Sequence, residues 1–549
     1  MSNPLEQLKS AAADATKKFG VAPATDARLE DALAGTIDPQ KLIDNCAEAW
    51  RVSADQAQSL LMAHGLGTIL ARLKPATGTT TNEIAGPPLA AADSLSLADG
   101  HIRIRALSPA FNEPIHANKA ILDSIHSGIT AFTAQAKHDP LGVLYRDHPS
   151  DYANRWLQEI APQIKAYCAK HFPNSSLKYI INSGIGANEQ FNYFVARLAN
   201  ARPGSHPQWL LANSPKELTD LPADATTTNT LFLEFSRSGI TEETIKLHEF
   251  TPPDAKRIVF ANTGPLRALA ERDGNLLLTL PDEVSGRYGR NKTPILMAPM
   301  YVAGMDVAAY WKTIQSACDT MDLTDRASAP VVIAQWLRVQ QLRRSANHIY
   351  LGTNSAAIRC SADEFCQFWN EGVNRDGNDI TMSRYLGLPR DSHMNLEAIL
   401  GTSEHKLAIF LLDTRNVAQV SNLCDSPAMR ASGVAPTSPV APVSNRCNLL
   451  TAITPINPAH ANLTLPEVDL VLALANVKRC SEKMPTLLIT VNTADLTASA
   501  WLGQLWADIT LVYSRLIGAD PGSNPEVKTV RTRAAEWLTN KQMAFELMP

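Results

Sequence analysis

Short apolar runs rich in β-branched and aliphatic residues recur from about residue 178, each followed by a turn signal and a stretch with helical spacing. Strands that read as continuous apolar runs are buried on both faces, as in parallel sheets covered by helices. The runs fall into two sets: residues 179–182, 231–235, 257–262 and 276–280, then 348–352, 406–413 and 486–491. The pattern predicts an α/β fold with two Rossmann-like units, each a mainly parallel sheet flanked by helices.

The segments outside these runs divide the chain around the two units. Apolar residues at helical spacing predict helices near the N-terminus, and residues 75–100, rich in Thr, Pro, Ala and Gly, predict a linker. The Pro- and Ser-rich residues 425–445 predict a long surface loop. We expect four parts: an N-terminal helical region with its linker over 1–105, a first α/β domain over 106–320, a second over 321–515, and a C-terminal helical tail over 516–549.

Composition and charge narrow the classes of function. Apolar residues make up 45% of the 549 residues, which suits large buried cores and not a disordered chain. A formal net charge of -4 argues against a broad basic surface for nucleic acid, but allows a small basic pocket for an anion. The N-terminal stretch lacks the apolar core of a signal peptide, and the most apolar later stretch, 295–305, is too short to span a bilayer. We expect a soluble, cytoplasmic protein that binds neither nucleic acid nor membrane.

Cysteine and histidine spacing bears on metals and redox compartment. The eight cysteines are scattered without a CxxC pair, and no HxH or HExxH motif occurs. Such usage is typical of free or buried thiols in a reducing compartment. We therefore expect no disulfide framework and no metal site.

A small-residue turn follows the first apolar run of the first unit. Residues 184–188 read GIGAN, which has two glycines of the dinucleotide pattern GxGxxG but lacks the third. No acidic ribose ligand follows at the expected distance, so a nucleotide-dependent dehydrogenase is a distant alternative. An ordinary tight turn between strand and helix is the favoured interpretation. Ligands of open α/β sheets bind beyond the carboxyl ends of such strands.

The segment after the run 231–235 is more informative. It supplies Ser236, Arg237, Ser238 and Thr241, followed by the helical pattern TEETIK. Hydroxyls, a guanidinium and the free amides of a helix N-terminus together suit a phosphate dianion. A plain helix cap is the alternative, but a cap needs one hydroxyl and this turn supplies several plus a cation. We favour anion binding.

Five segments then resemble one family in order. SRSGITEET resembles the SxSGxTxET phosphate loop of sugar isomerase (SIS) domains, and of phosphoglucose isomerases in particular. EVSGRYGRNKTP resembles that family's GGRYS signature, and FCQFWNEGVNRDGND the segment with its catalytic glutamate. RDSHMNLEAILGTSEH resembles the segment with its histidine, and GADPGSNPEVK the end of PFDQPGVELGK. The segments span roughly residues 180 to 528. The resemblance implies two SIS domains and reversible isomerisation of glucose 6-phosphate and fructose 6-phosphate, a step of glycolysis and gluconeogenesis.

The resemblance also assigns residues. Glu371 matches the base that moves a proton between C2 and C1 through a cis-enediol, and Arg287 the arginine that stabilises the enediolate. His393 and Lys528 match the pair associated with ring opening. The positions that match the substrate-binding and phosphate-binding part of the family's site are Ser236, Arg237, Ser238, Thr241, Gly186, Ala187, Asn188 and Gly286.

Several positions depart from the family's pattern. Ala187 and Asn188 stand where the family has glycine and serine, and Arg237 stands where lysine is common. An isomerase for another phosphosugar, or a sugar-phosphate sensor without catalysis, are therefore the alternatives. The chemistry implied needs no cofactor and no metal. Because the family's histidine is contributed across a dimer interface, the resemblance also implies a homodimer with shared active sites.

Overall fold

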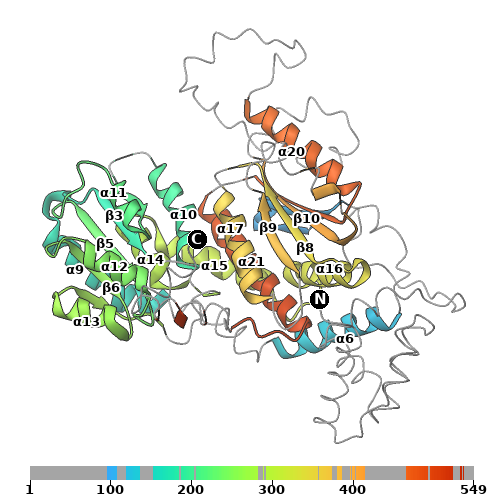
Figure 1. The fold of residues 1–549 in the computed structure, drawn as a ribbon, viewed down its shortest axis with the longest axis horizontal. Coiled ribbons are helices and arrows are strands. Elements are labelled where there is room, and N and C mark those ends of the chain that lie inside the picture. Colours follow the sequence, from blue (N-terminus) through green and yellow to red (C-terminus); the bar gives the residue numbers. More distant parts are fainter. Residues whose placement is uncertain are drawn as a thin grey trace, which may run out of the picture.

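The structure is a computed structural model, and it describes more than half of the chain. The described ranges are 95–107, 119–136, 153–184, 187–202, 206–281, 288–289, 292–355, 358–373, 380–385, 399–401, 403–414, 465–492 and 495–522, with a few single residues besides. Figure 1 shows two α/β units lying side by side, the first drawn in green and the second mainly in yellow to red.

The first unit is built on a five-stranded parallel sheet in the order β4-β3-β5-β6-β7. Its central strand β5 is buried at every position, as the continuous apolar run predicts. Helices cover both faces because each strand presents apolar side chains on both sides. The strands are β3 (Tyr179–Ser183), β4 (Gln208–Leu211), β5 (Thr230–Phe235), β6 (Lys256–Phe260) and β7 (Leu276–Leu278).

Helices pack on each face of this sheet. α9 (Ala161–His171), α10 (Ala187–Asn200) and α14 (Pro294–Val302) share one core with Ile180, Leu233 and Phe260. The opposite face carries α11 (Pro215–Thr219), α12 (Glu242–Phe250) and α13 (Gly264–Arg272), whose apolar residues form two smaller clusters with the sheet. Short helical turns precede β3: η4 (Trp156–Ile160) and η5 (Pro173–Ser175).

The second unit has a six-stranded sheet in the order β1-β2-β11-β10-β8-β9. Four of its strands are parallel, and β2 pairs antiparallel with both β1 and β11. The strands are β1 (Leu95–Leu97), β2 (Ile102–Ala106), β8 (His348–Thr353), β9 (Thr381–Tyr385), β10 (Lys406–Asp413) and β11 (Thr486–Val491), with short turns η1 (Ala98–Gly100) and η7 (Ser403–His405). The N-terminal hairpin β1–β2 therefore completes the sheet of the second unit.

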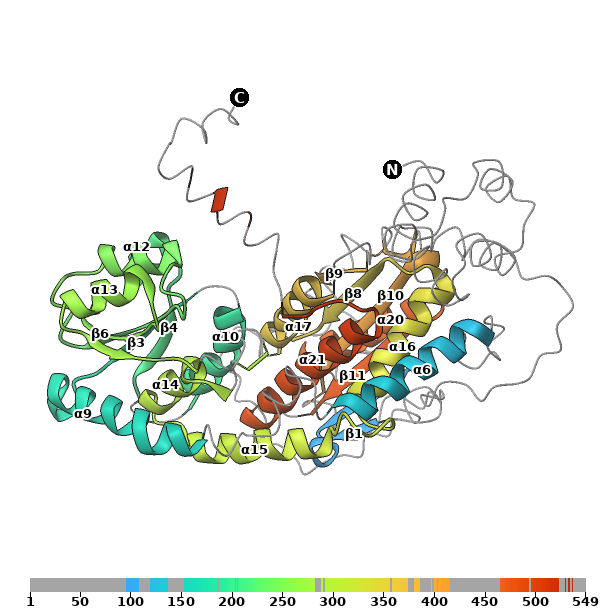
Figure 2. The same ribbon diagram turned by 90° about the horizontal axis from the view of Figure 1, so that it is seen from below.

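Helices also cover both faces of the second sheet. One face packs against α6 (Lys119–Gln135), α16 (Ala329–Arg344), α17 (Arg359–Gly372) and α21 (Leu496–Leu516) in the largest apolar core. The other face packs against α20 (Leu465–Ser481). α21 is buried from Ala498 to Ser514, because α16, α17 and α15 (Val307–Thr320) surround it. Figures 1 and 2 show α10, α15, α17 and α21 where the two units meet.

The predicted fold class, two mainly parallel sheets flanked by helices, is confirmed. The predicted domain limits stay predictions. Residues 95–106, at the end of the predicted N-terminal region and its linker, form β1 and β2 of the second sheet. α6, placed with the first domain, packs on α16 and α21. The N-terminal helical region, the loop 425–445 and most of the C-terminal tail lie outside the described residues. None of the helices in the described ranges is long and apolar enough to cross a bilayer.

Candidate active site

Strand order places a topological switch point in the first sheet, between β3 and β5. The second strand of the unit, β4, lies on one side of β3, and the third, β5, lies on the other. In open α/β sheets of this order, the loops that follow the two neighbouring strands, here β3 and β5, diverge. Ligands bind between such loops, at the carboxyl ends of the strands. The loop after β3 begins with Gly184, whose amide donates to Asn213 Oδ1 at 2.9 Å. The loop after β5 is residues 236–241, which we call the phosphate loop.

Inside the phosphate loop, the hydroxyls of Ser236 and Thr241 lie 2.8 Å apart and hydrogen-bond to each other. Thr241 is the N-cap residue of α12, yet its side chain accepts no hydrogen bond from the helix. Thr241 therefore does not act as a plain hydroxyl cap in this structure. The N-terminal amides of α12 keep their capacity for an anion, which a helix dipole favours at that end.

The backbone carbonyls of the phosphate loop are turned toward the neighbouring loop after β6. The Asn262 amide donates to Arg237 O at 3.0 Å, the Leu266 amide to Gly239 O at 3.0 Å, and the Thr263 hydroxyl to Ser238 O at 3.2 Å. These three bonds occupy carbonyl oxygens of the phosphate loop and hold it against the loop after β6. Two amides of the phosphate loop are also used, since Ser236 donates to Phe260 O and Gly239 to Ser236 O.

Two glycines allow the close approach of the loops. Gly239 has a φ of +64°, and a Cβ there would overlap the carbonyl oxygen of Thr263. Gly264, at the start of α13, has a φ of +80°, and its Cβ would lie 2.5 Å from the carbonyl oxygen of Ser238. Only glycine combines a positive φ with the missing side chain that this contact demands.

Arg237 extends from the phosphate loop toward the segment after β7. It is half-buried, and its Nη1 donates to the carbonyl oxygen of Pro281 at 3.3 Å. Ser238 is exposed. The cation and the hydroxyls named from the sequence therefore belong to one short loop at the edge of the sheet where ligands bind.

Glu371 lies in the last turn of α17 and is half-buried. Its Oε1 accepts a hydrogen bond from Gln367 Nε2 at 2.9 Å, one turn earlier on the same helix. α17 packs on α10, the helix that begins at Ala187 directly after the glycine turn. α10 thus connects the turn after β3 to the helix that carries Glu371.

The end of α17 also touches the segment that follows Arg287. The ring of Tyr288 lies 5.5 Å from that of Phe368, and a Cβ on Gly372 would overlap Tyr288 Oη. Ser514 Oγ of α21 donates to the carbonyl oxygen of Gly372 at 3.2 Å. Glu371 is therefore adjacent in the chain to Gly372, a residue of this contact.

Replacing Gly372 with alanine should lower the free energy of unfolding by about 1–3 kcal/mol, since the added methyl meets Tyr288 and lies 2.9 Å from Thr510 Cγ2 in a packed core. Urea unfolding measures the loss. The matched control is Gly128→Ala on α6, where the new Cβ lies 3.3 Å from the movable end of Leu516. There the helix propensity gained, about 1 kcal/mol, should offset any crowding. Equal effects of the two substitutions would contradict the close contact at Gly372.

Other predicted site residues lie outside the described residues: Gly186, Gly286, Arg287, His393 and Lys528. Ala187 and Asn188 are the first residues of α10. Their roles stay predictions. Within the described ranges, no group of three His, Cys, Asp or Glu side chains could hold a metal ion. The described cysteines are free thiols, and burial raises the pKa of Cys168 and Cys480 to about 11.

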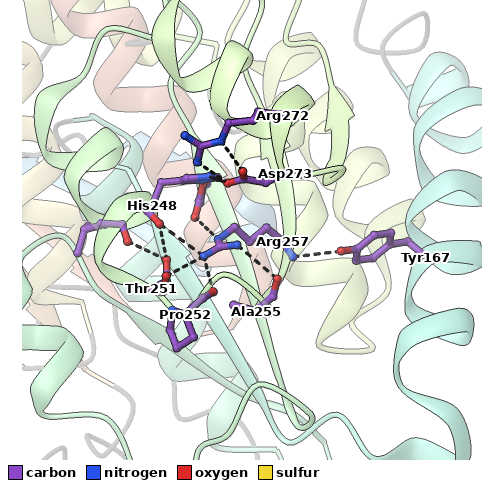
Figure 3. A network of polar contacts seen from close by, with 10 residues as sticks. Tyr167, His248, Thr251, Pro252, Ala255, Arg257, Arg272 and Asp273 are labelled. Carbon is purple, nitrogen blue, oxygen red and sulfur yellow. Dashed lines mark hydrogen bonds and ion pairs between the residues drawn. The ribbon is translucent and has the colours of Figure 1, made fainter.

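A buried charged cluster next to the phosphate loop was missed in the sequence (Figure 3). His248 on α12 lies between two carboxylates: its Nδ1 is 2.6 Å from Glu234 Oε2, and its Nε2 is 3.0 Å from Asp273 Oδ2. Glu234 and His248 are 1% and 2% exposed. One signal was available, because Glu234 is the only charged residue in the apolar run LFLEF.

Arg257, at the start of β6, is the fourth member of this charged cluster and is 1% exposed. Its Nε lies 3.5 Å from Glu234 Oε1, and its Nη2 donates to the carbonyl oxygens of Thr251 at 3.1 Å and Pro252 at 2.8 Å, just past the end of α12. The guanidinium thus caps the C-terminal end of the helix, where a cation suits the dipole. The Arg257 amide donates to Tyr167 Oη at 3.1 Å.

Comparisons with known proteins were made by sequence and by fold. No family model matches the chain. It is 25% identical over 252 residues to a protein of Haloarcula marismortui named as a probable glucose-6-phosphate isomerase, covering 44% of this chain and 56% of that protein. It is 28% identical over 184 residues to a glucose-6-phosphate isomerase of Thermus thermophilus, covering 31% of this chain and 44% of the relative. The chain thus matches only about half of the length of these relatives.

Two solved structures share the fold over most of the chain. A hypothetical protein from Thermus thermophilus superposes with a TM-score of 0.58 at 20% identity, covering 79% of this chain and 99% of that one. A glucose-6-phosphate isomerase from Chlamydia trachomatis gives a TM-score of 0.55 at 11% identity, covering 82% and 90%. At these identities the likeness concerns the fold alone. Part of the sequence is thus similar to glucose-6-phosphate isomerases, and the chain shares its fold with a solved structure of such an enzyme.

Proposed function

We propose that the chain is a phosphosugar isomerase that interconverts glucose 6-phosphate and fructose 6-phosphate. The observation that carries this proposal is the phosphate loop: a turn with hydroxyls and a guanidinium leads into a helix whose N-cap hydroxyl leaves the helix amides uncapped, at the switch point of a parallel sheet. Sugar phosphates present a dianion that such a loop binds. The glucose-6-phosphate isomerases that resemble part of the chain support the choice of hexose.

In the proposed reaction the phosphate is held by Ser236, Ser238, Thr241 and Arg237. Glu371 removes the proton from C2 of the open-chain aldose and returns it to C1, so that a cis-enediol forms and collapses to the ketose. Arg287 stabilises the negative charge on the enediolate oxygen. His393 and Lys528 move the protons that open the sugar ring. Since a proton is only moved within the substrate, the overall reaction balances without an oxidant or reductant.

We further propose a homodimer, in which His393 of each subunit serves the site of its partner. Sedimentation equilibrium of the active protein tests this part on its own. A fully active monomer would contradict the shared site but leave the isomerisation chemistry in place.

The isomerase activity is tested by following glucose 6-phosphate formed from fructose 6-phosphate with a coupled dehydrogenase. Turnover with these hexoses, and slower turnover with other phosphosugars, is the expected result. Binding of fructose 6-phosphate without turnover would favour the sensor. Faster turnover of another phosphosugar would favour a different aldose–ketose pair, for which the departures at Ala187 and Asn188 are the first residues to exchange.

A further inference from the structure

The charged cluster of Glu234, His248, Arg257 and Asp273 flanks the phosphate loop on both sides in the chain. Glu234 lies on β5, two residues before Ser236, and His248 lies on α12, seven residues after Thr241. Asp273 follows α13, the helix whose loop contacts the phosphate loop through Gly264. The cluster therefore joins the strand that enters the loop to the helix that leaves it. Figure 3 shows three of its members, His248, Arg257 and Asp273.

We propose that Glu234, His248 and Arg257 are positioning residues for phosphate binding, which hold α12 in the orientation that directs its N-terminal amides at the substrate. The inference rests on the proposed function, because it concerns the same anion site. None of the three residues belongs to the phosphate loop itself.

The energetics of burial support a positioning role. Buried charges cost free energy unless they are paired, and well-packed apolar residues at such sites are often as stable or more so. Hydrogen bonds between charged groups also depend on direction, so they fix the orientation of the elements that carry them. The two bonds of the His248 imidazole fix the rotation of α12, and the bonds of Arg257 fix its C-terminal end. A rigid helix of nine residues passes a shift at one end to the other. A small misplacement of the amides then weakens their hold on a dianion.

Protonation of His248 couples this arrangement to pH. The groups that face it are Glu234 from β5, Arg257 from β6, and Asp273 with its neighbour Arg272 after α13; Lys246 and Glu249 of its own helix pair with each other on the surface. Burial lowers the pKa of His248, but the hydrogen bonds with Glu234 and Asp273 outweigh burial and raise it above 6.5.

The sign of the pH effect follows from this direction. A raised pKa in the folded state means that the imidazolium stabilises the fold fully below the ordinary value of about 6.5, and that this contribution is lost as the pH rises through the folded pKa. Above it, one ring nitrogen loses its proton and faces a carboxylate oxygen. α12 then loosens, and the affinity for a sugar phosphate falls. The substrate phosphate, with a second pKa near 6, is mainly a dianion above pH 6.5 and becomes more fully so as the pH rises, so its own titration changes KM in the opposite direction.

Steady-state kinetics from pH 6.5 to pH 9.5 test the inference, with native protein, His248→Gln and Ile164→Val compared. Glutamine can reach only one carboxylate and carries no charge. We expect KM for fructose 6-phosphate to be raised about fivefold in His248→Gln at pH 6.5, with kcat changed less than about twofold. As the pH rises from 6.5, the KM of the native protein should rise toward that of the variant, whose KM should not rise with pH. Ile164 is buried on the opposite face of the same sheet, so its variant controls for lost stability.

A native KM that is flat across this range, or a His248→Gln variant with native KM, would overturn the positioning role. Should the variant fail to fold, the pH dependence of the native protein still decides. If the native protein shows no turnover, the proposed function fails separately, and calorimetric binding of glucose 6-phosphate over the same pH range tests the inference by itself.

Discussion

Replacing Glu371 with glutamine should lower kcat by about 10²- to 10⁴-fold while leaving the affinity for fructose 6-phosphate within about threefold. Glutamine keeps the size of the side chain and can still hydrogen-bond to Gln367, so α17 should retain its structure. It cannot accept the proton from C2, so the transition state loses its base. The coupled assay gives kcat, and calorimetric titration with fructose 6-phosphate gives binding.

The matched control for this substitution is Asp363→Asn on the same helix. Asp363 makes an ion pair with Arg384 at 2.6 Å and belongs to no part of the proposed site. The same change of charge there should alter kcat by less than about threefold, since only a partly exposed ion pair is lost. Activity that survives in Glu371→Gln, or that falls equally in both variants, would remove Glu371 from the role of base.

Replacing Gly239 with alanine should lower the free energy of unfolding by about 2–4 kcal/mol and abolish measurable sugar-phosphate binding. The added Cβ would overlap the Thr263 carbonyl oxygen, a backbone atom that cannot rotate away. Relief requires the phosphate loop to separate from residues 262–266, which breaks the three hydrogen bonds that Asn262, Thr263 and Leu266 donate to it. Urea unfolding and glucose 6-phosphate titration measure the two effects.

Gly274 provides an unusually close control for Gly239. Its φ is also +64°, but no atom lies within 4 Å of a Cβ built there. Gly274→Ala should therefore cost only the backbone strain of a left-handed residue, about 1 kcal/mol, and should leave binding intact. The difference between the two alanine variants isolates the contact between the loops. If both cost the same, the loops do not pack as closely as described.

The buried strands could be predicted from the sequence because they are apolar on both faces. The runs 231–235, 406–413 and 486–491 coincide closely with β5, β10 and β11. β1, β2, β4 and β9 were missed. β1, β4 and β9 are edge strands of their sheets, and β2 lies next to the edge strand β1. An edge strand needs few apolar residues, since one side of its backbone and part of its side chains face water. β4, for example, begins with an exposed residue, Gln208.

For the candidate site too, the parts made of consecutive residues could be predicted, and the parts made of distant segments could not. The turn at residues 236–241 could be predicted because its hydroxyls, its cation and the start of α12 are consecutive in the chain; its role in phosphate binding stays a prediction. The approach of Tyr288 to Gly372, and the cluster around His248, join segments that no local pattern connects. Arg257, read alone, resembles a surface cation. The carbonyls past the end of α12, together with the carboxylate of Glu234, explain why it is buried.

The hairpin β1–β2 carries a consequence for synthesis on the ribosome. Ala106 of β2 pairs with Leu487 of β11, about 380 residues later, so the edge of β2 has to wait about 20 to 80 s for its partner at ordinary translation speeds. An unpaired apolar strand exposed for so long is a hazard for aggregation. The sequence of β2, Ile-Arg-Ile-Arg-Ala, alternates its buried isoleucines with Arg103 and Arg105. Two positive charges on one face repel an identical strand of another nascent chain. They therefore disfavour aggregation through β2 until β11, the last strand of its sheet, has been synthesised.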